Sequence, residues 1–174
     1  DVPVDHLFGA SILAKYINEK NMEDVIVVSP DLGGVTRARD LADRIGAPIA
    51  IIEKKRPEPG VAKVMNLIGD VAGKNCIIID DIVDTAGSLV EGAKALEEFG
   101  AKSVTAAVTH AVLTDPASER IASSNIKELI VTNTIPLPEN CNLPNITQLS
   151  VAPLLGEAIM RIFHEVSVSN LFDK

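Results

Sequence analysis

The sequence predicts a single α/β domain, built on a mainly parallel β-sheet flanked by helices. Short runs of apolar residues alternate with longer stretches of helical periodicity through most of the chain. The runs at 25–28 and 76–79 are apolar without alternation, as expected for parallel strands buried on both faces. With 174 residues, of which 47% are hydrophobic, the chain can bury one full core but not two. We therefore expect residues 1–174 to form one domain.

Composition narrows the range of functions. A net charge of −8 and a pI near 4.8 argue against a nucleic-acid surface, which needs a basic patch. Cys76 and Cys141 have the spacing of neither a metal site nor a disulfide framework. No apolar run approaches the roughly 18 to 20 residues that cross a membrane, and no signal-peptide pattern opens the sequence. We therefore expect a soluble protein without nucleic-acid or membrane partners, in the cytoplasm, with an organelle such as a plastid left open.

The first part of the chain predicts a helix, a strand, a glycine-containing turn and a second helix. Apolar residues recur at helical spacing between Leu7 and Glu19. Val25 to Val28 predicts a strand, and the sequence S-P-D-L-G-G-V-T-R-A-R leads from it into a helix that ends at Gly46. Ala47 to Ile52 then predicts the next strand.

A long charged loop is expected after that strand, at Glu53 to Lys63. Its sequence contains two prolines and one glycine, which disfavour regular structure. Lys54, Lys55 and Arg56 form a cationic cluster in an otherwise acidic chain. Long loops that follow strands are commonly lids over a site, whereas most charge runs are solvated surface. The position after a strand favours the lid.

The alternation of strands and helices continues to the end of the chain. The remaining expected elements are, in order, a strand at 65–68, a turn at 70–74, a strand at 76–79, a helix at 89–99, a strand at 103–108, a helix near 116–123, a strand at 129–132, a loop at 134–144, a strand at 146–149 and a closing helix at 151–164. His110 follows a strand end, where it can line a site or form a structural hydrogen bond.

The most informative stretch is the sequence K-N-C-I-I-I-D-D-I-V-D-T-A-G-S-L at 74–89. Asp80 and Asp81 are expected to end the apolar strand, and a helix is expected from Leu89. The loop between them lies at the carboxyl end of a parallel strand, where open α/β sheets bind their ligands. Free N–H groups at a helix start favour an anion. A phosphate can therefore be wrapped by the amides and hydroxyls of Thr85, Ala86, Gly87 and Ser88.

The neighbouring carboxylates indicate what else the ligand carries. Three acidic residues beside a phosphate cradle fit a ligand that has hydroxyl groups and a divalent cation. Asp80 and Asp81 can accept hydrogen bonds from a sugar diol or hold Mg2+, which makes a sugar phosphate more plausible than free phosphate. The alternative is an ordinary strand-to-helix turn in which Asp84 caps the helix.

The turn after the first strand shows a weaker pattern of the same kind. Gly33 and Gly34 let the backbone approach a ligand, and Asp31 stands where it can reach a metal ion. Two glycines fall far short of a nucleotide fingerprint, and a plain turn with Asp31 near the helix start also fits. Arg37 and Arg39 point to different sides of the following helix, so we expect only one of them to face a site.

The motif D-D-x-x-D-T-A-G-S, between an apolar strand and a helix, resembles the phosphoribosyl-diphosphate signature of type I phosphoribosyltransferases and ribose-phosphate pyrophosphokinases. Further stretches resemble the carboxyl-terminal half of the pyrophosphokinases in particular: S-P-D-L-G-G-V-T-R-A-R, E-K-K-R-P-E-P, V-M-N-L-I-G-D-V-A-G-K and S-V-A-P-L-L-G-E-A-I. Together they cover essentially the whole chain. The resemblance implies a type I phosphoribosyltransferase-like fold.

The resemblance also implies a reaction and a set of site residues. The intact protein would be a ribose-phosphate diphosphokinase, transferring pyrophosphate from MgATP to C1 of ribose 5-phosphate to make phosphoribosyl diphosphate for nucleotide biosynthesis. The implied sites are ribose 5-phosphate at Asp80, Asp81, Asp84, Thr85, Ala86, Gly87 and Ser88, pyrophosphate at Asp31, Leu32, Gly33 and Gly34, Mg2+ at Asp31, and catalysis at Lys54 and Arg56. Ser88 departs from the family's usual threonine but keeps the hydroxyl.

Partners follow from the same resemblance. The amino-terminal half of the family, which carries most ATP contacts, is absent from this sequence, and family members assemble into hexamers. We therefore expect a homo-oligomeric enzyme when full length, and a 174-residue chain that binds ribose 5-phosphate weakly but is inactive alone. The alternatives are a phosphoribosyltransferase that consumes phosphoribosyl diphosphate, and a non-catalytic regulatory relative of the synthetase.

Overall fold

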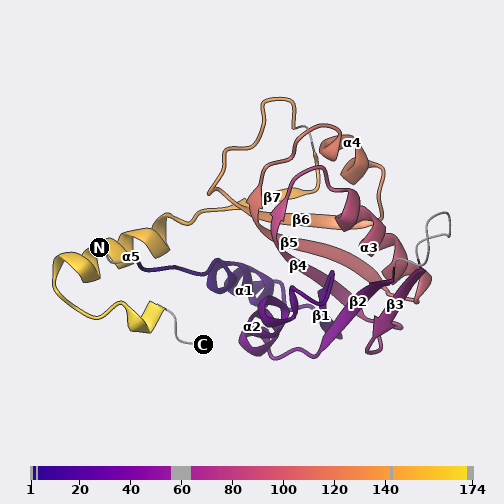
Figure 1. Ribbon diagram of the computed structural model, residues 1–174, viewed down its shortest axis with the longest axis horizontal. Helices are drawn as coiled ribbons and strands as arrows, with labels where there is room; N and C mark the ends of the chain where they lie inside the picture. The colour runs from indigo at the N-terminus through magenta and orange to yellow at the C-terminus, as the bar shows by residue number, and fades with distance from the viewer. Residues whose placement is uncertain (1, 3, 56–63, 142, 172–174) are drawn as a thin grey trace.

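A seven-stranded sheet in the order β3-β2-β1-β4-β5-β6-β7 forms the centre of the molecule (Figure 1). The computed structural model describes the chain except for residues 1, 3, 56–63, 142 and 172–174. The strands are β1 (Val25–Ser29), β2 (Ile49–Lys55), β3 (Val64–Ile68), β4 (Asn75–Val83), β5 (Ser103–Ala111), β6 (Ile126–Thr132) and β7 (Ile146–Leu149). Neighbouring strands are parallel except for β2 and β3, which are antiparallel. The predicted mainly parallel α/β fold is confirmed.

Helices cover both faces of this sheet. One face carries α1 (Ala10–Glu19) and α2 (Val35–Ile45), and the other carries α3 (Gly87–Glu98) and α4 (Ala117–Ala122). The chain closes with α5 (Ala152–Phe163) and a short 3-10 helix, η1 (Ser169–Leu171). Figure 1 shows α5 standing clear of the sheet, and only its Ala158 is buried.

The central strands are apolar on both sides because both of their faces are covered. Ile77 and Ile79 of β4 point into the core under α1 and α2, while Cys76 and Ile78 point into the core under α3. Each of these four side chains is at most 1% exposed. Burying one such isoleucine contributes about 1.5 to 3 kcal/mol, so the continuous apolar run fixes β4 at the centre of the sheet.

The ends of β4 and α3 differ from the sequence-based expectation. β4 continues through Asp80 and Asp81 to Val83, so the expectation that the two aspartates end the strand is wrong. The reason is β5, whose backbone pairs with this extension as far as Val83 and Ala111. Helix α3 begins at Gly87, earlier than the expected Leu89. The loop between β4 and α3 is therefore shorter than predicted.

The expected charged loop is also partly a strand. β2 runs to Lys55, although regular structure was expected to end before Glu53. Its antiparallel partner β3 explains this, because Glu53 pairs with Asn66 and Lys55 with Val64. The rest of the expected loop, at 56–63, lies outside the described residues.

Candidate functional site

Two loops that are far apart in the sequence meet at one edge of the sheet. β1 and β4 are parallel neighbours, with Val28 paired to Ile78, so the segments after them lie at the same carboxyl-terminal edge. One segment is the turn at 30–34 and the other is the end of β4 with the loop at 84–86. Sheet topology therefore brings the two sequence-predicted loops together, as expected for a ligand site of an open α/β sheet.

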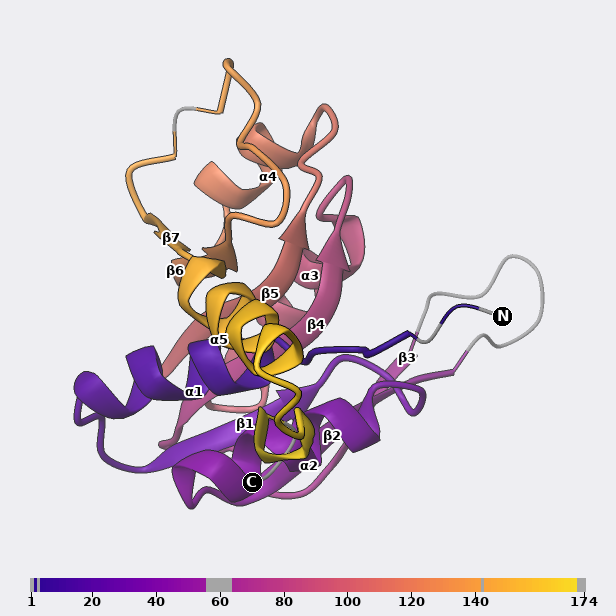
Figure 2. The same cartoon turned by 90° about the vertical axis from the view of Figure 1, so that its left-hand side faces the viewer.

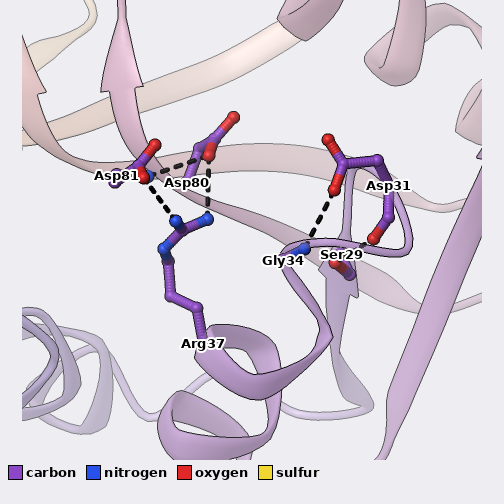
Figure 3. Close-up of polar contacts among 6 residues, drawn as sticks. All are labelled: Ser29, Asp31, Gly34, Arg37, Asp80 and Asp81. Carbon is purple, nitrogen blue, oxygen red and sulfur yellow. Dashed lines mark hydrogen bonds and ion pairs between the residues drawn. The ribbon is translucent and has the colours of Figure 1, made fainter.

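The turn after β1 is held by its own polar groups. Asp31 Oδ1 accepts a hydrogen bond from the Gly34 N–H at 2.9 Å, and Ser29 Oγ donates to the Asp31 carbonyl oxygen at 2.6 Å (Figure 3). A Cβ at position 34 would lie 2.8 Å from Ser29 Oγ, so the turn requires glycine there. Asp31 thus uses one carboxylate oxygen for the turn, and its other oxygen makes no hydrogen bond within the described residues.

Arg37 joins the acidic residues of β4 to helix α2. Its Nη1 donates to Asp80 Oδ1 at 2.9 Å and its Nη2 donates to Asp81 Oδ2 at 2.5 Å (Figure 3). Asp80 Oδ1 also accepts from the Asp81 N–H at 2.9 Å. Burial raises the pKa of Asp80 to about 6 even though Arg37 opposes the shift. Asp80 is therefore an ionised carboxylate near neutral pH that binds a proton readily below it.

The loop between β4 and α3 is braced from the side of α4. Thr114 donates its hydroxyl to Asp84 Oδ1, and Arg120 Nη1 donates to the Thr85 carbonyl oxygen at 2.9 Å. No side chain caps α3, so the alternative role of Asp84 as its cap is wrong. The residue before the helix is Ala86, buried and left-handed with φ 58°. Such a conformation costs a non-glycine residue about 1 to 2 kcal/mol and is found where loop geometry is functionally constrained.

The start of α3 presents backbone donors to this loop. The first bond along the helix runs from the Val90 N–H to the Ala86 carbonyl at 3.0 Å. The N–H groups of Gly87, Ser88 and Leu89 precede it and have no partner within the helix. Uncapped N–H groups at a helix start form a positive end that attracts an anion. The loop can therefore hold a phosphate.

Of the two residues predicted to be catalytic, the structure describes the backbone of one. Lys54 lies in β2, and β2 pairs with β1 up to Ser29 and Ile51. Lys54 therefore lies beyond the end of β1, at the same edge as the turn that carries Asp31. Arg56 lies outside the described residues. The catalytic assignments stay predictions.

Two side chains of the site, Thr114 and Arg120, were not predicted from the sequence, and Arg37 was predicted only as one of two candidates. Only one of Arg37 and Arg39 faces the candidate site, as expected: Arg37 bonds to Asp80, whereas Arg39 is exposed and makes no hydrogen bond to the described residues. No feature of the sequence distinguishes the two arginines, because the partners of Arg37 lie on β4. His110 makes the structural hydrogen bond that was one of its two expected roles, with Nδ1 2.9 Å from Thr134 Oγ1.

The donor set at this edge suits a cation that prefers oxygen ligands. Mg2+ in proteins is bound by one or two carboxylates, with substrate phosphates and water completing its shell. The unengaged oxygen of Asp31 fits this requirement. Within the described ranges, no group of three or more His, Cys, Asp or Glu residues could hold a metal ion by itself. The residues present therefore fit Mg2+ carried in with phosphates better than a closed metal centre.

The fold and the paired loops define the class of protein, an α/β domain of the phosphoribosyltransferase type. A family comparison makes the assignment narrower: residues 53–173 match the phosphoribosyl synthetase-associated domain, and the chain belongs to this family. Ribose-phosphate pyrophosphokinase of Bacillus caldolyticus is 61% identical over 173 residues, covering 99% of this chain and 55% of that protein. The enzyme of Bacillus subtilis (strain 168) is 59% identical over 172 residues. The chain thus spans about half the length of the curated relatives it matches.

Solved structures agree with this assignment. The crystal structure of phosphoribosylpyrophosphate synthetase from Mycobacterium smegmatis gives a TM-score of 0.87 at 44% identity, over 95% of this chain and 54% of that one. A purine phosphoribosyltransferase from Pyrococcus horikoshii gives a TM-score of 0.51 at 27% identity, over 62% of this chain and 73% of that one. The predicted resemblance is confirmed. None of the helices in the described residues has the length and apolar character to cross a membrane.

Proposed function

We propose that this chain is the part of a ribose-phosphate pyrophosphokinase that binds ribose 5-phosphate and positions it for pyrophosphate transfer from ATP. The observation that carries the proposal is the meeting of two loops, after β1 and after β4, in a chain that aligns over 99% of its length with such enzymes. One loop offers a phosphate site at a helix start, and the other offers carboxylate and glycine groups beside it.

Ribose 5-phosphate would lie along the end of β4. Its phosphate would accept hydrogen bonds from the uncapped N–H groups of Gly87, Ser88 and Leu89, with the Thr85 and Ser88 hydroxyls beside them. Its ring hydroxyls would donate to Asp80 and Asp81, which are acceptors when ionised. Binding of both ends fixes the orientation of the anomeric C1 hydroxyl.

The reaction would be attack of that C1 hydroxyl on the β-phosphorus of ATP. The new bond joins the sugar oxygen to the β-phosphorus, and the proton of the C1 hydroxyl is released to water. The bond from the β-phosphorus to the oxygen bridging to the α-phosphate breaks, and AMP leaves with that oxygen and the electron pair of the bond. Such transfers are catalysed mainly by positioning and by stabilising the charge on the transferred group. Lys54 and Arg56 are the proposed cations over this group, and Asp31, Leu32, Gly33 and Gly34 form the proposed pyrophosphate turn.

Mg2+ and the remaining partners belong to the proposal as well. Asp31 would hold the ion through the oxygen that the turn leaves unengaged, and bound Mg2+ supplies positive charge to the phosphates. ATP binding would require the residues of the relatives that have no counterpart in this chain. We further propose that the complete protein is a homo-oligomer.

Titration of the 174-residue chain tests the binding half of this proposal. Calorimetry is expected to detect ribose 5-phosphate binding, while a product assay with MgATP is expected to detect no phosphoribosyl diphosphate from this chain alone. A Cβ at position 87 would lie 3.5 Å from Arg120 Nη1, an ordinary contact distance, so Gly87→Ala should fold normally. It should weaken ribose 5-phosphate binding because the added methyl group would crowd a phosphate held at the start of α3. Gly156→Ala is the matched control, because a Cβ there meets nothing within 4 Å.

Three outcomes would contradict the proposal. Absence of binding at millimolar ribose 5-phosphate would remove the loop as the phosphate site. Robust synthesis from ATP by this chain alone would show that no further residues are needed. Release of pyrophosphate from phosphoribosyl diphosphate that depends on a nucleobase, without ATP, would instead identify a phosphoribosyltransferase.

A further inference from the structure

We propose that Arg37 is a positioning residue that holds Asp80 and Asp81 in the arrangement that selects ribose 5-phosphate over 2-deoxyribose 5-phosphate. This inference rests on the proposed function and extends it to a residue of α2 that the sequence did not distinguish from Arg39. The contact that carries it is the bridge from one guanidinium to two consecutive carboxylates, at 2.9 and 2.5 Å.

The geometry of arginine suits this bridge. Its two terminal nitrogens donate in one plane at a fixed spacing, so a single guanidinium can fix two acceptors relative to each other. Arg37 uses Nη1 for Asp80 and Nη2 for Asp81, and the Asp81 N–H adds a second hydrogen bond to the same oxygen of Asp80. A lysine ammonium is a point charge and lacks this spacing.

The base of Arg37 is anchored in the structure. It lies in the first turns of α2, next to Ala38, which is fully buried, and Leu41 is buried one turn further on. A Cβ at Gly34 would lie 3.4 Å from Arg37 Nη1, so the glycine of the neighbouring turn leaves the space that the guanidinium occupies. The helix and the turn thus place the guanidinium beneath the acidic pair.

Half of each carboxylate remains available for a ligand. Figure 3 shows the second oxygens of Asp80 and Asp81 pointing away from Arg37. Neither the two hydrogen bonds from Arg37 nor the one from the Asp81 N–H uses these oxygens. Arg37 therefore leaves one free acceptor on each residue. This distinguishes a positioning role from a blocking role, in which the guanidinium would occupy the acceptors that a ligand needs.

Two fixed acceptors match two neighbouring hydroxyls. A ribose offers both the 2- and the 3-hydroxyl, whereas a 2-deoxyribose offers one and leaves the second carboxylate unpaired. Sites built to hydrogen-bond a hydroxyl discriminate strongly against ligands that lack it. Without Arg37 the two like charges repel and no longer share a fixed geometry, so the second hydroxyl contributes less.

Calorimetric titrations of the 174-residue chain test this inference. The ligands are ribose 5-phosphate, 2-deoxyribose 5-phosphate and inorganic phosphate. The variants are Arg37→Met, Arg37→Lys and, as a matched control on the same helix, Arg39→Met. The unaltered chain should prefer the ribose ligand about tenfold or more, a difference of about 1.4 kcal/mol. Arg37→Met should reduce that preference to about twofold and leave phosphate binding unchanged, Arg37→Lys should restore it in part, and Arg39→Met should have no effect.

The same titrations separate failure of the inference from failure of the proposed function. An Arg37→Met chain that keeps the full preference, or binds ribose 5-phosphate more tightly, would overturn the positioning role. Equal binding of both sugars by the unaltered chain would do the same while leaving the phosphate site intact. Lack of binding of all three ligands would count against the proposed function itself. If circular dichroism shows Arg37→Met to be unfolded, Arg37→Lys decides the matter, because a chain that keeps the full preference would contradict the need for the guanidinium.

Discussion

At the level of single residues, the ionised carboxylate of Asp80 lowers the stability of the fold, because it is partly buried. Burial raises its pKa from 3.8 to about 6. The folded state therefore binds the proton more tightly than the unfolded state, and the stability associated with this group is complete below pH 3.8 and is lost as the pH rises through about 6. At neutral pH the protein accepts this cost in order to present an ionised acceptor.

We predict that Asp80→Asn stabilises the chain at neutral pH and abolishes its preference for ribose 5-phosphate over 2-deoxyribose 5-phosphate. The pKa shift corresponds to at most about 3 kcal/mol, and the side chain is 32% exposed, so a gain of about 1 kcal/mol is expected. Urea denaturation at about pH 7 and about pH 4 measures it. The difference in free energy of unfolding between the variant and the unaltered chain should disappear at the lower pH. A difference that persists there would show that the stabilisation does not come from removing the Asp80 charge.

The polar partners in the site show what a sequence can and cannot predict for one residue. Gly87 and Ser88 were predicted as site residues because free backbone N–H groups at the start of a helix attract anions in proteins generally. Arg37 could not be distinguished from Arg39, and Arg120 could not be predicted, because the acceptors of Arg37 and Arg120 lie 43 and 35 residues away in the chain. Such contacts depend on strand order, which local patterns do not encode.

At the level of elements, a cluster of polar side chains links α1 to strands β6 and β7 at one edge of the sheet. Glu128 of β6 accepts hydrogen bonds from Tyr16 at 2.7 Å and from Thr147 of β7 at 2.8 Å, and Lys20 Nζ lies 2.6 Å from its other oxygen. Burial would raise the pKa of Glu128, but the hydrogen bonds from Lys20, Tyr16 and Thr147 outweigh it and lower the pKa. The ionised carboxylate is therefore stabilised by the fold.

We predict that Glu128→Gln lowers the free energy of unfolding at neutral pH by about 1 to 2 kcal/mol. A group with a lowered pKa contributes stability above its unfolded pKa of 4.5 and loses it as the pH falls through the folded value. The effect should therefore shrink in acid, opposite in sign to that of Asp80→Asn. Glu139→Gln is the control, because Glu139 is exposed and makes no hydrogen bond to any residue that the structure describes. Equal effects of the two substitutions would argue against the cluster.

Strand centres were predicted well and strand ends poorly, for a physical reason. Apolar runs such as Cys76 to Ile79 are buried on both faces, which is the condition that a hydrophobicity pattern detects. The extensions of β4 to Val83 and of β2 to Lys55 are polar and exist because a neighbouring backbone pairs with them. Backbone pairing leaves no signature in the side chains.

At the level of the whole molecule, the chain should become an enzyme when joined to the residues it lacks relative to longer homologues. We predict that fusing the unmatched residues of the Bacillus caldolyticus relative to this chain yields ATP-dependent synthesis of phosphoribosyl diphosphate. The 61% identity over 173 residues supports compatible contacts between the two parts. A product assay with MgATP and ribose 5-phosphate measures it. A folded fusion that binds ribose 5-phosphate without turnover would favour the non-catalytic alternative.

The same fusion tests the proposed role of Lys54. Lys54→Ala should lower kcat about a hundredfold or more, as loss of a group that stabilises transition-state charge does. The KM for ribose 5-phosphate should change much less, because the proposed sugar site lies on β4 and α3. Lys55→Ala, at the next position of β2, is the matched control. Unchanged turnover in Lys54→Ala would remove this residue from the mechanism.

The class of fold was predictable because alternating strands and helices leave few arrangements for a chain of this length. The order of the strands in the sheet was not part of that prediction.

The strand order affects how the sheet forms and how bound substrates stabilise it. β1 and β4 pair in register although about fifty residues separate Val28 from Ile78, a contact whose closure is slow and entropically unfavourable. In the proposed site, ribose 5-phosphate lies at the end of β4 and the transferred pyrophosphate group lies at the turn after β1, so the bound substrates together would bridge this distant pair of strands. Bound substrates would thus stabilise the pairing of β1 with β4, which joins the strand segments farthest apart in the sequence. Part of their binding free energy would appear as resistance of the protein to unfolding.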